Sequence, residues 1–266
     1  MKTRAITGFF FIAVLIAAVL LGAEVFLVFF TALAALAIAE FYTMVATDVI
    51  KPLRGLGIAA IVSICALLGA YFLGFMPLAF VAACIPFFSL IFIIPLFQKQ
   101  VLPFHDIAYT LLGILYAGMP FVVFLSLGFV GGHFNGYIPL GFLILLWSSD
   151  TGAYLAGRSF GKHKLFERIS PNKTWEGFFG GLLLAVGVSL ILAHYFESMA
   201  SWQWIILSLL IAIFGSLGDL VESMLKRSLG VKDSGHILPG HGGILDRFDG
   251  LLLAVPLVYL FLVFTL

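Results

Sequence analysis

Residues 25–45 read VFLVFFTALAALAIAEFYTMV, and Glu40 is the one charged residue in this stretch. A membrane-spanning helix needs about 20 mostly apolar residues, because the hydrocarbon core is about 30 Å thick and a helix rises about 1.5 Å per residue. The stretch is therefore long enough to cross a bilayer. Glu40 lies close to its end, and we interpret this residue as structural rather than functional, with a side chain that snorkels or pairs with Lys51 or Arg54.

Apolar runs of this kind extend over the whole chain of 266 residues. Hydrophobic residues make up 62% of the sequence, charged residues only 10%, and the mean hydropathy is +1.18. This composition excludes a soluble enzyme, a disordered chain and a disulfide scaffold. The sequence predicts an all-α, polytopic transmembrane helical bundle with about nine spans. The expected spans are residues 5–23, 25–45, 55–72, 78–97, 107–130, 138–156, 177–195, 202–221 and 248–266.

The basic residues predict the sidedness of these spans. All 14 Lys and Arg residues lie before the first span or after the second, fourth, sixth and eighth spans. Cytoplasmic loops carry the excess of Lys and Arg in membrane proteins. We therefore expect a cytoplasmic N-terminus and an external C-terminus. The first apolar run is longer than that of a typical signal peptide, so we expect it to be retained as a helix.

Polar residues become frequent from the sixth span onward. Residues 147–154, WSSDTGAY, place Asp150 within or at the edge of the bilayer, where an unpaired carboxylate is costly. Asp150 either faces a polar cavity or makes an interhelical hydrogen bond, and the sequence favours neither. In the following loop, residues 170–177 read SPNKTWEG. Ser170, Asn172 and Thr174 are candidate helix caps, and Lys173 then lies near a helix N-terminus, which favours anions. This loop is a candidate phosphate-binding edge, although a basic loop that only orients the protein also explains its charge.

The densest group of polar residues begins in the eighth span, where residues 215–227 read GSLGDLVESMLKR. In a helix, Asp219, Glu222, Ser223 and Lys226 share one face, because they are spaced at i, i+3, i+4 and i+7. A glycine-rich turn follows at residues 239–243, and Asp246, Arg247 and Asp249 come at the start of the ninth span.

These residue types are typical of a metal–polyphosphate site. Mg²⁺ takes one or two carboxylates and completes its shell with phosphate oxygens and water, and Asp219 and Asp246 can supply those carboxylates. The nearby bases can neutralise phosphates, and the glycines let the backbone approach them. The main alternative is an ion- or proton-coupled transporter. Its acids should line a path across the membrane, whereas these acids are grouped with bases at one face.

Residues 223–249, SMLKRSLGVKDSGHILPGHGGILDRFD, resemble the signature of the phosphatidate cytidylyltransferase family in its bacterial form. Asp150, residues 170–177 and Asp219 are also similar to positions of that family. The resemblance implies transfer of a cytidylyl group from CTP to phosphatidic acid, which gives CDP-diacylglycerol and pyrophosphate for phospholipid biosynthesis. It implies Mg²⁺ as the required metal and allows an assisting K⁺. It also suggests a homodimer in the cell inner membrane, with the active site facing the cytoplasm and no nucleic-acid partner.

Within this resemblance we assign roles to the polar residues. We expect residues 1–145 to be mainly structural, lipid-facing and dimer-forming, and residues 146–266 to be catalytic. The alternatives are a cytidylyltransferase for another lipid phosphate, a lipid-alcohol kinase and the transporter. The expected catalytic residues are Asp219, Asp246, Lys226 and Arg247; the expected phosphate or nucleotide contacts are Lys173, Ser223, Arg227, Lys232, His241, Gly242 and Gly243; the expected metal ligands are Asp219 and Asp246, with Asp249 and Glu222 as second-rank candidates.

Overall fold

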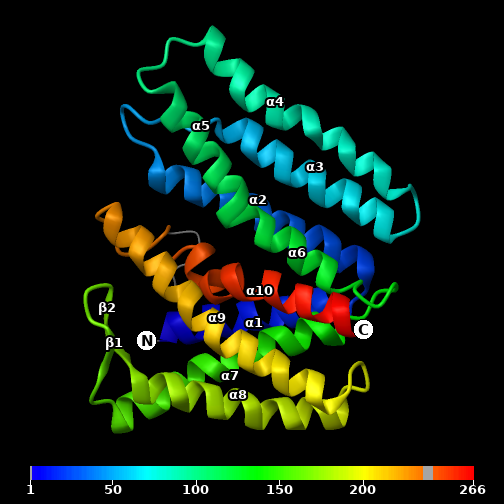
Figure 1. Cartoon of the computed structure of the whole chain (residues 1–266), viewed down its shortest axis with the longest axis vertical. Helices are drawn as coiled ribbons and strands as arrows, with labels where there is room; N and C mark the ends of the chain where they lie inside the picture. The colour runs from blue at the N-terminus through cyan, green and yellow to red at the C-terminus, as the bar shows by residue number, and fades with distance from the viewer. Residues whose placement is uncertain (1, 236–241) are drawn as a thin grey trace. The chain divides into compact units, whose positions relative to one another are not determined.

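The computed structural model describes residues 2–235 and 242–266, with side chains from residue 8 onward, as a mainly helical chain (Figure 1). The described residues include eight helical segments that are long and apolar enough to cross a membrane. They correspond to the second to ninth expected spans. The first expected span is helix α1 (Lys2–Leu20), whose described apolar part is Gly8–Leu20. The prediction of an all-α polytopic membrane bundle is confirmed.

The described residues fold into two compact units. The first unit comprises Met1–Leu125 and Asp233–Asp246, and the second comprises Ser126–Lys232 and Arg247–Leu266. Each unit therefore combines a long continuous part of the chain with a short segment from near its C-terminal end.

Helices form the described part of the first unit. Its elements are α1 (Lys2–Leu20), α2 (Ala23–Val45), α3 (Arg54–Phe72), the 3-10 segment η1 (Leu78–Cys84), α4 (Ile85–Ile93), the 3-10 segment η2 (Ile94–Phe97), α5 (Pro103–Leu112), the π-helical segment η3 (Gly113–Gly118) and most of α6 (Met119–Leu127). Phe26 and Phe30 of α2 and Phe124 of α6 are fully buried, and the ring centroids of Phe30 and Phe124 are 4.7 Å apart. Such aromatic contacts add to the burial of apolar area in this core.

The polar part of the first-unit core lies at the other end of α2. The hydroxyl of Tyr42 donates a hydrogen bond of 2.7 Å to the carbonyl oxygen of Thr110 in α5. The fully buried Asp106 accepts a hydrogen bond of 2.6 Å from the backbone N–H of Lys51. The first contact joins α2 to the last turn of α5, and the second holds the segment between α2 and α3 against the first turn of α5.

The second unit consists of four long helices and one short hairpin. Its elements are α7 (Tyr137–Phe160), β1 (Lys164–Phe166), β2 (Ser170–Thr174), α8 (Trp175–Tyr195), α9 (Ser201–Ser228) and most of α10 (Leu245–Thr265). Helices α7 and α8 lie side by side (Figure 1) and approach closely through small residues. A Cβ added to Gly181 would lie 2.6 Å from the carbonyl oxygen of Ser149, so glycine is what allows this approach.

Several of the expected span boundaries in α7, α8 and α9 are corrected, and one local structure is added. Helix α7 continues to Phe160 rather than 156, α8 begins at Trp175 rather than 177, and α9 continues to Ser228 rather than 221. The extension of α9 carries its polar face beyond the expected span. The loop after α7 contains the antiparallel pair β1–β2, which apolar periodicity did not predict because its residues are largely exposed.

Candidate functional site

The site in the second unit is built on the junction between strand β2 and helix α8. Thr174 is extended (φ −128°), and its side-chain oxygen accepts a hydrogen bond of 3.1 Å from the backbone N–H of Gly177. This is the geometry of a helix N-cap, so the expected capping role of Thr174 is confirmed. Ser170 and Asn172 lie in β2 and do not cap α8, which corrects their expected role. The cap places Lys173 immediately before the helix N-terminus, as predicted.

Lys173 reaches from this junction to the middle of α9. Its Nζ atom lies 2.6 Å from Oδ2 of Asp219 and 3.5 Å from the carbonyl oxygen of Ser216. The other carboxylate oxygen of Asp219 accepts a hydrogen bond of 3.3 Å from the hydroxyl of Ser223. The structure thus brings together an expected phosphate-binding base and an expected metal ligand that are far apart in the sequence.

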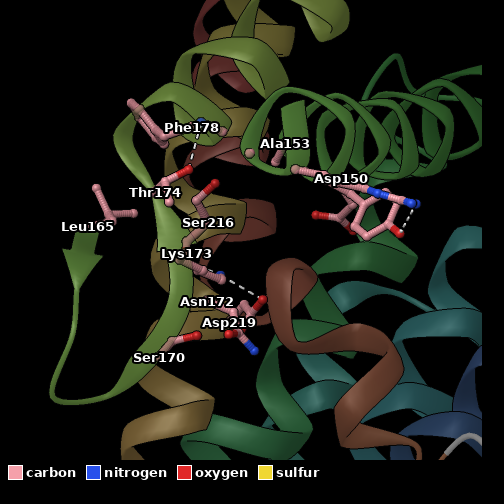
Figure 2. A pocket seen from close by; sticks show the side chains of 14 residues that line it. Asp150, Ala153, Leu165, Ser170, Asn172, Lys173, Thr174, Phe178, Ser216 and Asp219 are labelled. Carbon is pink, nitrogen blue, oxygen red and sulfur yellow. Dashed lines mark hydrogen bonds and ion pairs between the residues drawn. The ribbon is translucent and has the colours of Figure 1, made fainter. Parts of the chain in front are cut away.

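A pocket of about 550 Å³ opens beside this ion pair (Figure 2). Helices α7, α8 and α9 and the β1–β2 hairpin all contribute to its lining. Asp150, Lys173 and Asp219 supply the charged groups labelled in Figure 2, and Ser170, Asn172 and Ser216 supply neutral polar groups. Asp150 therefore faces a polar pocket, which was one of its two expected environments. Arg158, also in the lining, donates a hydrogen bond of 3.2 Å to the hydroxyl of Tyr154.

Further acids surround Asp219. Asp150, Glu222 and Asp249 are all close enough to interact electrostatically with one another or with Asp219. Glu222 is only 1% exposed and forms an ion pair with Lys226 on the same helix face. The expected shared face of Asp219, Glu222, Ser223 and Lys226 is therefore confirmed, with Ser223 bonded to Asp219 and Lys226 bonded to Glu222.

The donor chemistry of this cluster fits a hard divalent cation. The carboxylates of Asp150, Asp219, Glu222 and Asp249 lie near one another, with Lys173 paired to Asp219 and Lys226 paired to Glu222. Within the described residues, no three His, Cys, Asp or Glu side chains form a complete metal-holding group. Mg²⁺ does not require one, because it takes one or two carboxylates and fills the other positions with phosphate oxygens and water.

Asp246 belongs to the first unit and lies in the first turn of α10, directly after the turn formed by residues 242–244. Its Oδ2 atom accepts hydrogen bonds of 2.9 Å from the backbone N–H groups of Ser234 and Gly243, and it also lies 2.9 Å from the hydroxyl oxygen of Ser234. Gly242 has φ +81°, a left-handed conformation that favours glycine. Asp219 and Asp246 belong to different units, so their joint action as metal ligands stays a prediction.

Glu40 of α2 contacts this turn, and sequence reasoning missed its role there. It is 5% exposed and accepts hydrogen bonds from the hydroxyl of Ser234 and the backbone N–H groups of Ile244 and Leu245. The described residues include no ion pair of Glu40 with Lys51 or Arg54, so that expected pairing is wrong. Hydrogen bonds to a charged group contribute about 1.5–3 kcal/mol each, which offsets the cost of burying the carboxylate. The available signal was the presence of an acid inside a long apolar span.

The structure gives fewer contacts for the remaining residues that were expected in the site. Arg227 and Lys232 are exposed near the end of α9 and after it, and Arg247 is exposed in the first turn of α10. Asp249 accepts a hydrogen bond of 2.7 Å at Oδ1 from the backbone N–H of Gly250. His241 lies outside the described residues.

The comparisons of this chain with known proteins all indicate the same family. The family model described as "Cytidylyltransferase family" matches residues 2–265. A phosphatidate cytidylyltransferase of Staphylococcus epidermidis is 47% identical over 169 residues, which cover 63% of this chain and 64% of the relative. One of Staphylococcus saprophyticus is 47% identical over 62% of this chain and 63% of the relative. The chain thus matches less than two thirds of the length of these two relatives. A phosphatidate cytidylyltransferase of Staphylococcus aureus (strain COL) is 38% identical over 99% of both chains. The chain belongs to the cytidylyltransferase family.

Proposed function

We propose that this membrane protein transfers a cytidylyl group from CTP to phosphatidic acid, giving CDP-diacylglycerol and pyrophosphate. The observation that carries the proposal is the pocket in which Lys173 and Asp219 meet beside Asp150. A cationic group and several carboxylates, together with neutral polar groups, suit a metal-bound polyphosphate. The names of the relatives supply the substrate pair.

The reaction needs no covalent intermediate on the protein. A phosphate oxygen of phosphatidic acid attacks the α-phosphorus of CTP, a new P–O–P linkage forms, and the bond between the α-phosphorus and the bridging oxygen to the β-phosphate breaks. Pyrophosphate leaves with that oxygen and its electron pair. The protein's task is to hold two anionic substrates together and to stabilise the charge that moves to the leaving group.

The basic residues perform this electrostatic task. Lys173 is already placed in the pocket, and it exchanges the carboxylate of Asp219 for a phosphate oxygen when CTP binds. Lys226, Arg227, Lys232 and Arg247 neutralise the remaining phosphate charge, with Ser223, His241, Gly242 and Gly243 as further contacts. Positive charge in a site that excludes water favours the transition state more than it does in bulk solvent.

The metal in this proposal is Mg²⁺, held by Asp219 and Asp246, with Asp249 and Glu222 as second-rank ligands and K⁺ as an assisting ion. When bound, it neutralises phosphate oxygens and supplies Lewis-acid stabilisation of the leaving pyrophosphate. The grouping of several carboxylates around Asp219 supports its presence. The hydrogen bonds to Oδ2 of Asp246 restrain a second carboxylate for the same purpose.

The membrane arrangement follows from the two substrates. Phosphatidic acid enters from the bilayer with its acyl chains still in lipid, and CTP arrives from the cytosol. We place the protein in the cell membrane with its N-terminus and its active site on the cytoplasmic side, its C-terminus outside and a second copy as partner. The distribution of the 14 basic residues supports this orientation.

One assay separates this function from its alternatives. Purified protein in detergent is given phosphatidic acid, Mg²⁺ and CTP labelled at the α-phosphate, and both lipid-bound label and free pyrophosphate are measured. Cytidylyl transfer puts the label into the lipid and releases pyrophosphate in equal amount. A lipid-alcohol kinase leaves the label in the nucleotide, and a transporter consumes no nucleotide and instead moves solute across sealed vesicles. Either of these two results contradicts the proposal.

A further inference from the structure

A buried carboxylate in α2 holds the turn that carries Asp246, although the two residues are more than 200 positions apart in the sequence. We infer that Glu40 is a positioning residue for the reaction. It lies in the part of the chain that the sequence predicts to be structural, and it orients Asp246 without touching substrate. This inference rests on the proposed function, because it takes Asp246 as a member of the site.

The contacts of Glu40 all point to this turn. Oε2 accepts a hydrogen bond of 2.9 Å from the backbone N–H of Ile244, and Oε1 accepts one of 3.0 Å from that of Leu245. Oε1 also accepts a hydrogen bond of 2.5 Å from the hydroxyl of Ser234. One carboxylate thus binds both the segment before Gly235 and the first residues of α10.

Asp246 is held by the same two segments. Its Oδ2 atom accepts from the backbone N–H of Ser234 on one side and from that of Gly243 on the other. Ser234 Oγ lies within hydrogen-bond distance of both carboxylates, at 2.5 Å from Glu40 and 2.9 Å from Asp246. Loss of the Glu40 carboxylate therefore frees Ser234 Oγ and the N–H groups of Ile244 and Leu245, which loosens the two segments that orient Asp246.

The glycines of the turn support this arrangement. A Cβ on Gly235 would lie 2.7 Å from Oε2 and 2.8 Å from Cδ of Glu40, and a Cβ on Gly243 would overlap the same carboxylate. Gly243 was expected to let the backbone approach a phosphate. In the structure, the absence of a side chain at Gly243 makes room for the carboxylate of Glu40. This is a second physical reason for glycine at this position of the motif.

A positioning role has a kinetic signature that a purely structural role lacks. A less restrained Asp246 binds Mg²⁺ less tightly, so the concentration of Mg²⁺ that gives half-maximal turnover should rise. Residues that orient a metal ligand typically contribute about 10–100-fold to metal affinity or activity. High Mg²⁺ should then restore part of the lost rate.

The test compares Glu40→Gln with Glu24→Gln. Both replace a carboxylate of α2 by an amide of the same shape, but Glu24 is exposed in the first turn of the helix. In Glu40→Gln, the side-chain NH₂ group faces the hydroxyl and backbone N–H groups of the turn, which are themselves hydrogen-bond donors. We expect kcat/KM for CTP to fall about 10–100-fold, half-saturation by Mg²⁺ to rise several-fold, and Glu24→Gln to match the wild type. Hydrogen–deuterium exchange of peptides containing Ile244 and Leu245 should become faster in Glu40→Gln alone.

The outcomes separate this inference from the proposed function. Folded Glu40→Gln with wild-type Mg²⁺ dependence and unchanged exchange at Ile244 and Leu245 overturns it, even where total activity falls. If Glu40→Gln does not fold, Ser234→Ala is the deciding variant, because it removes only the hydroxyl that lies between the two carboxylates. An unchanged Mg²⁺ requirement in Ser234→Ala also overturns the inference. A wild-type protein without CTP turnover contradicts the proposed function instead, and the exchange experiment still tests whether Glu40 holds the turn.

Discussion

The Nζ atom of Lys173 lies 2.6 Å from Oδ2 of Asp219, so a base at the end of β2 is paired with an acid in α9. Both side chains are only partly exposed. The base expected to bind phosphate and the acid expected to bind metal therefore neutralise each other in the absence of substrates. When a nucleotide binds together with its cation, a phosphate can pair with Lys173 and the cation can pair with Asp219. Neither residue is then left with an unpaired charge.

The first prediction concerns Lys173. Lys173→Gln should lower kcat/KM for CTP by about 10²–10³-fold, the range typical of removing one stabilising group from the transition state. Lys173→Arg should restore little, because the planar guanidinium differs in shape and reach from the ammonium. Pyrophosphate release measures the effect. Lys162→Gln, which changes an exposed lysine on the same segment, should leave the rate unchanged; an equal loss there would show that only the overall charge of the segment matters.

The second prediction concerns the two expected metal ligands. Asp219→Asn and Asp246→Asn should each abolish Mg²⁺-dependent CTP turnover, because an amide oxygen does not supply the charge that Mg²⁺ requires. Both variants should remain folded, as judged by size-exclusion chromatography and circular dichroism. Asp48→Asn, at an exposed position between α2 and α3, is the matched control and should be fully active. Wild-type-like activity in both Asp219→Asn and Asp246→Asn would refute the metal assignment.

The third prediction concerns the metal itself. Chelation with EDTA should stop cytidylyl transfer, and excess Mg²⁺ should restore it, because the carboxylates around Asp219 repel the phosphates of CTP when no cation is bound. The helical circular dichroism signal should not change, since the described helices are held by packing. Transfer that continues at full rate in EDTA is the result that excludes Mg²⁺ from the reaction.

The fourth prediction concerns the cap of α8. Thr174→Val keeps the shape of the side chain but removes the oxygen that accepts from the N–H of Gly177. We expect a loss of about 0.5–2 kcal/mol in stability, the usual cost of losing a helix N-cap, and a lower turnover because Lys173 is the adjacent residue. Thr43→Val removes an exposed hydroxyl that bonds within α2, so its melting temperature in detergent should stay close to that of the wild type.

The fifth prediction concerns the contact between α9 and α10 within the second unit. A Cβ on Gly218 would lie 3.2 Å from Cα of Gly250 and 3.3 Å from the carbonyl carbon of Asp249. Gly218→Ala should therefore cost about 1–3 kcal/mol and displace Asp249, because backbone atoms cannot rotate away as a side chain can. Gly187→Ala, where an added Cβ meets nothing within 4 Å, should be neutral or slightly stabilising. Equal melting temperatures for the two variants would contradict the tight α9–α10 contact.

Much of the helical architecture follows from local sequence. Apolar runs of about 20 residues predict spans because the bilayer sets their length, and eight such helices occur among the described residues. The shared face of Asp219, Glu222, Ser223 and Lys226 also follows from helical spacing alone. The capping role of Thr174 required only the pattern of a hydroxyl residue before an apolar run.

Other features depend on contacts between distant segments. The β1–β2 hairpin is short and exposed, so it has too little apolar alternation to be predicted. Glu40 looked like a peripheral acid near two bases, yet it is bound by backbone N–H groups about 200 residues away. A buried carboxylate must find hydrogen-bond donors, but the sequence does not state which segment supplies them.

The sequence by itself determined that this is a polytopic helical membrane protein. Backbone N–H and C=O groups without hydrogen bonds are costly in lipid, so long apolar runs cross the membrane as helices, which satisfy these groups internally. Its motif also determined the family. The tertiary structure alone decided that Lys173 meets Asp219 beside a pocket and that Glu40 holds the turn of Asp246. The physical reason is that hydrophobic length and periodicity are local properties, whereas the choice of partner for a charged group depends on which donors and acceptors the folded chain brings within about 3 Å.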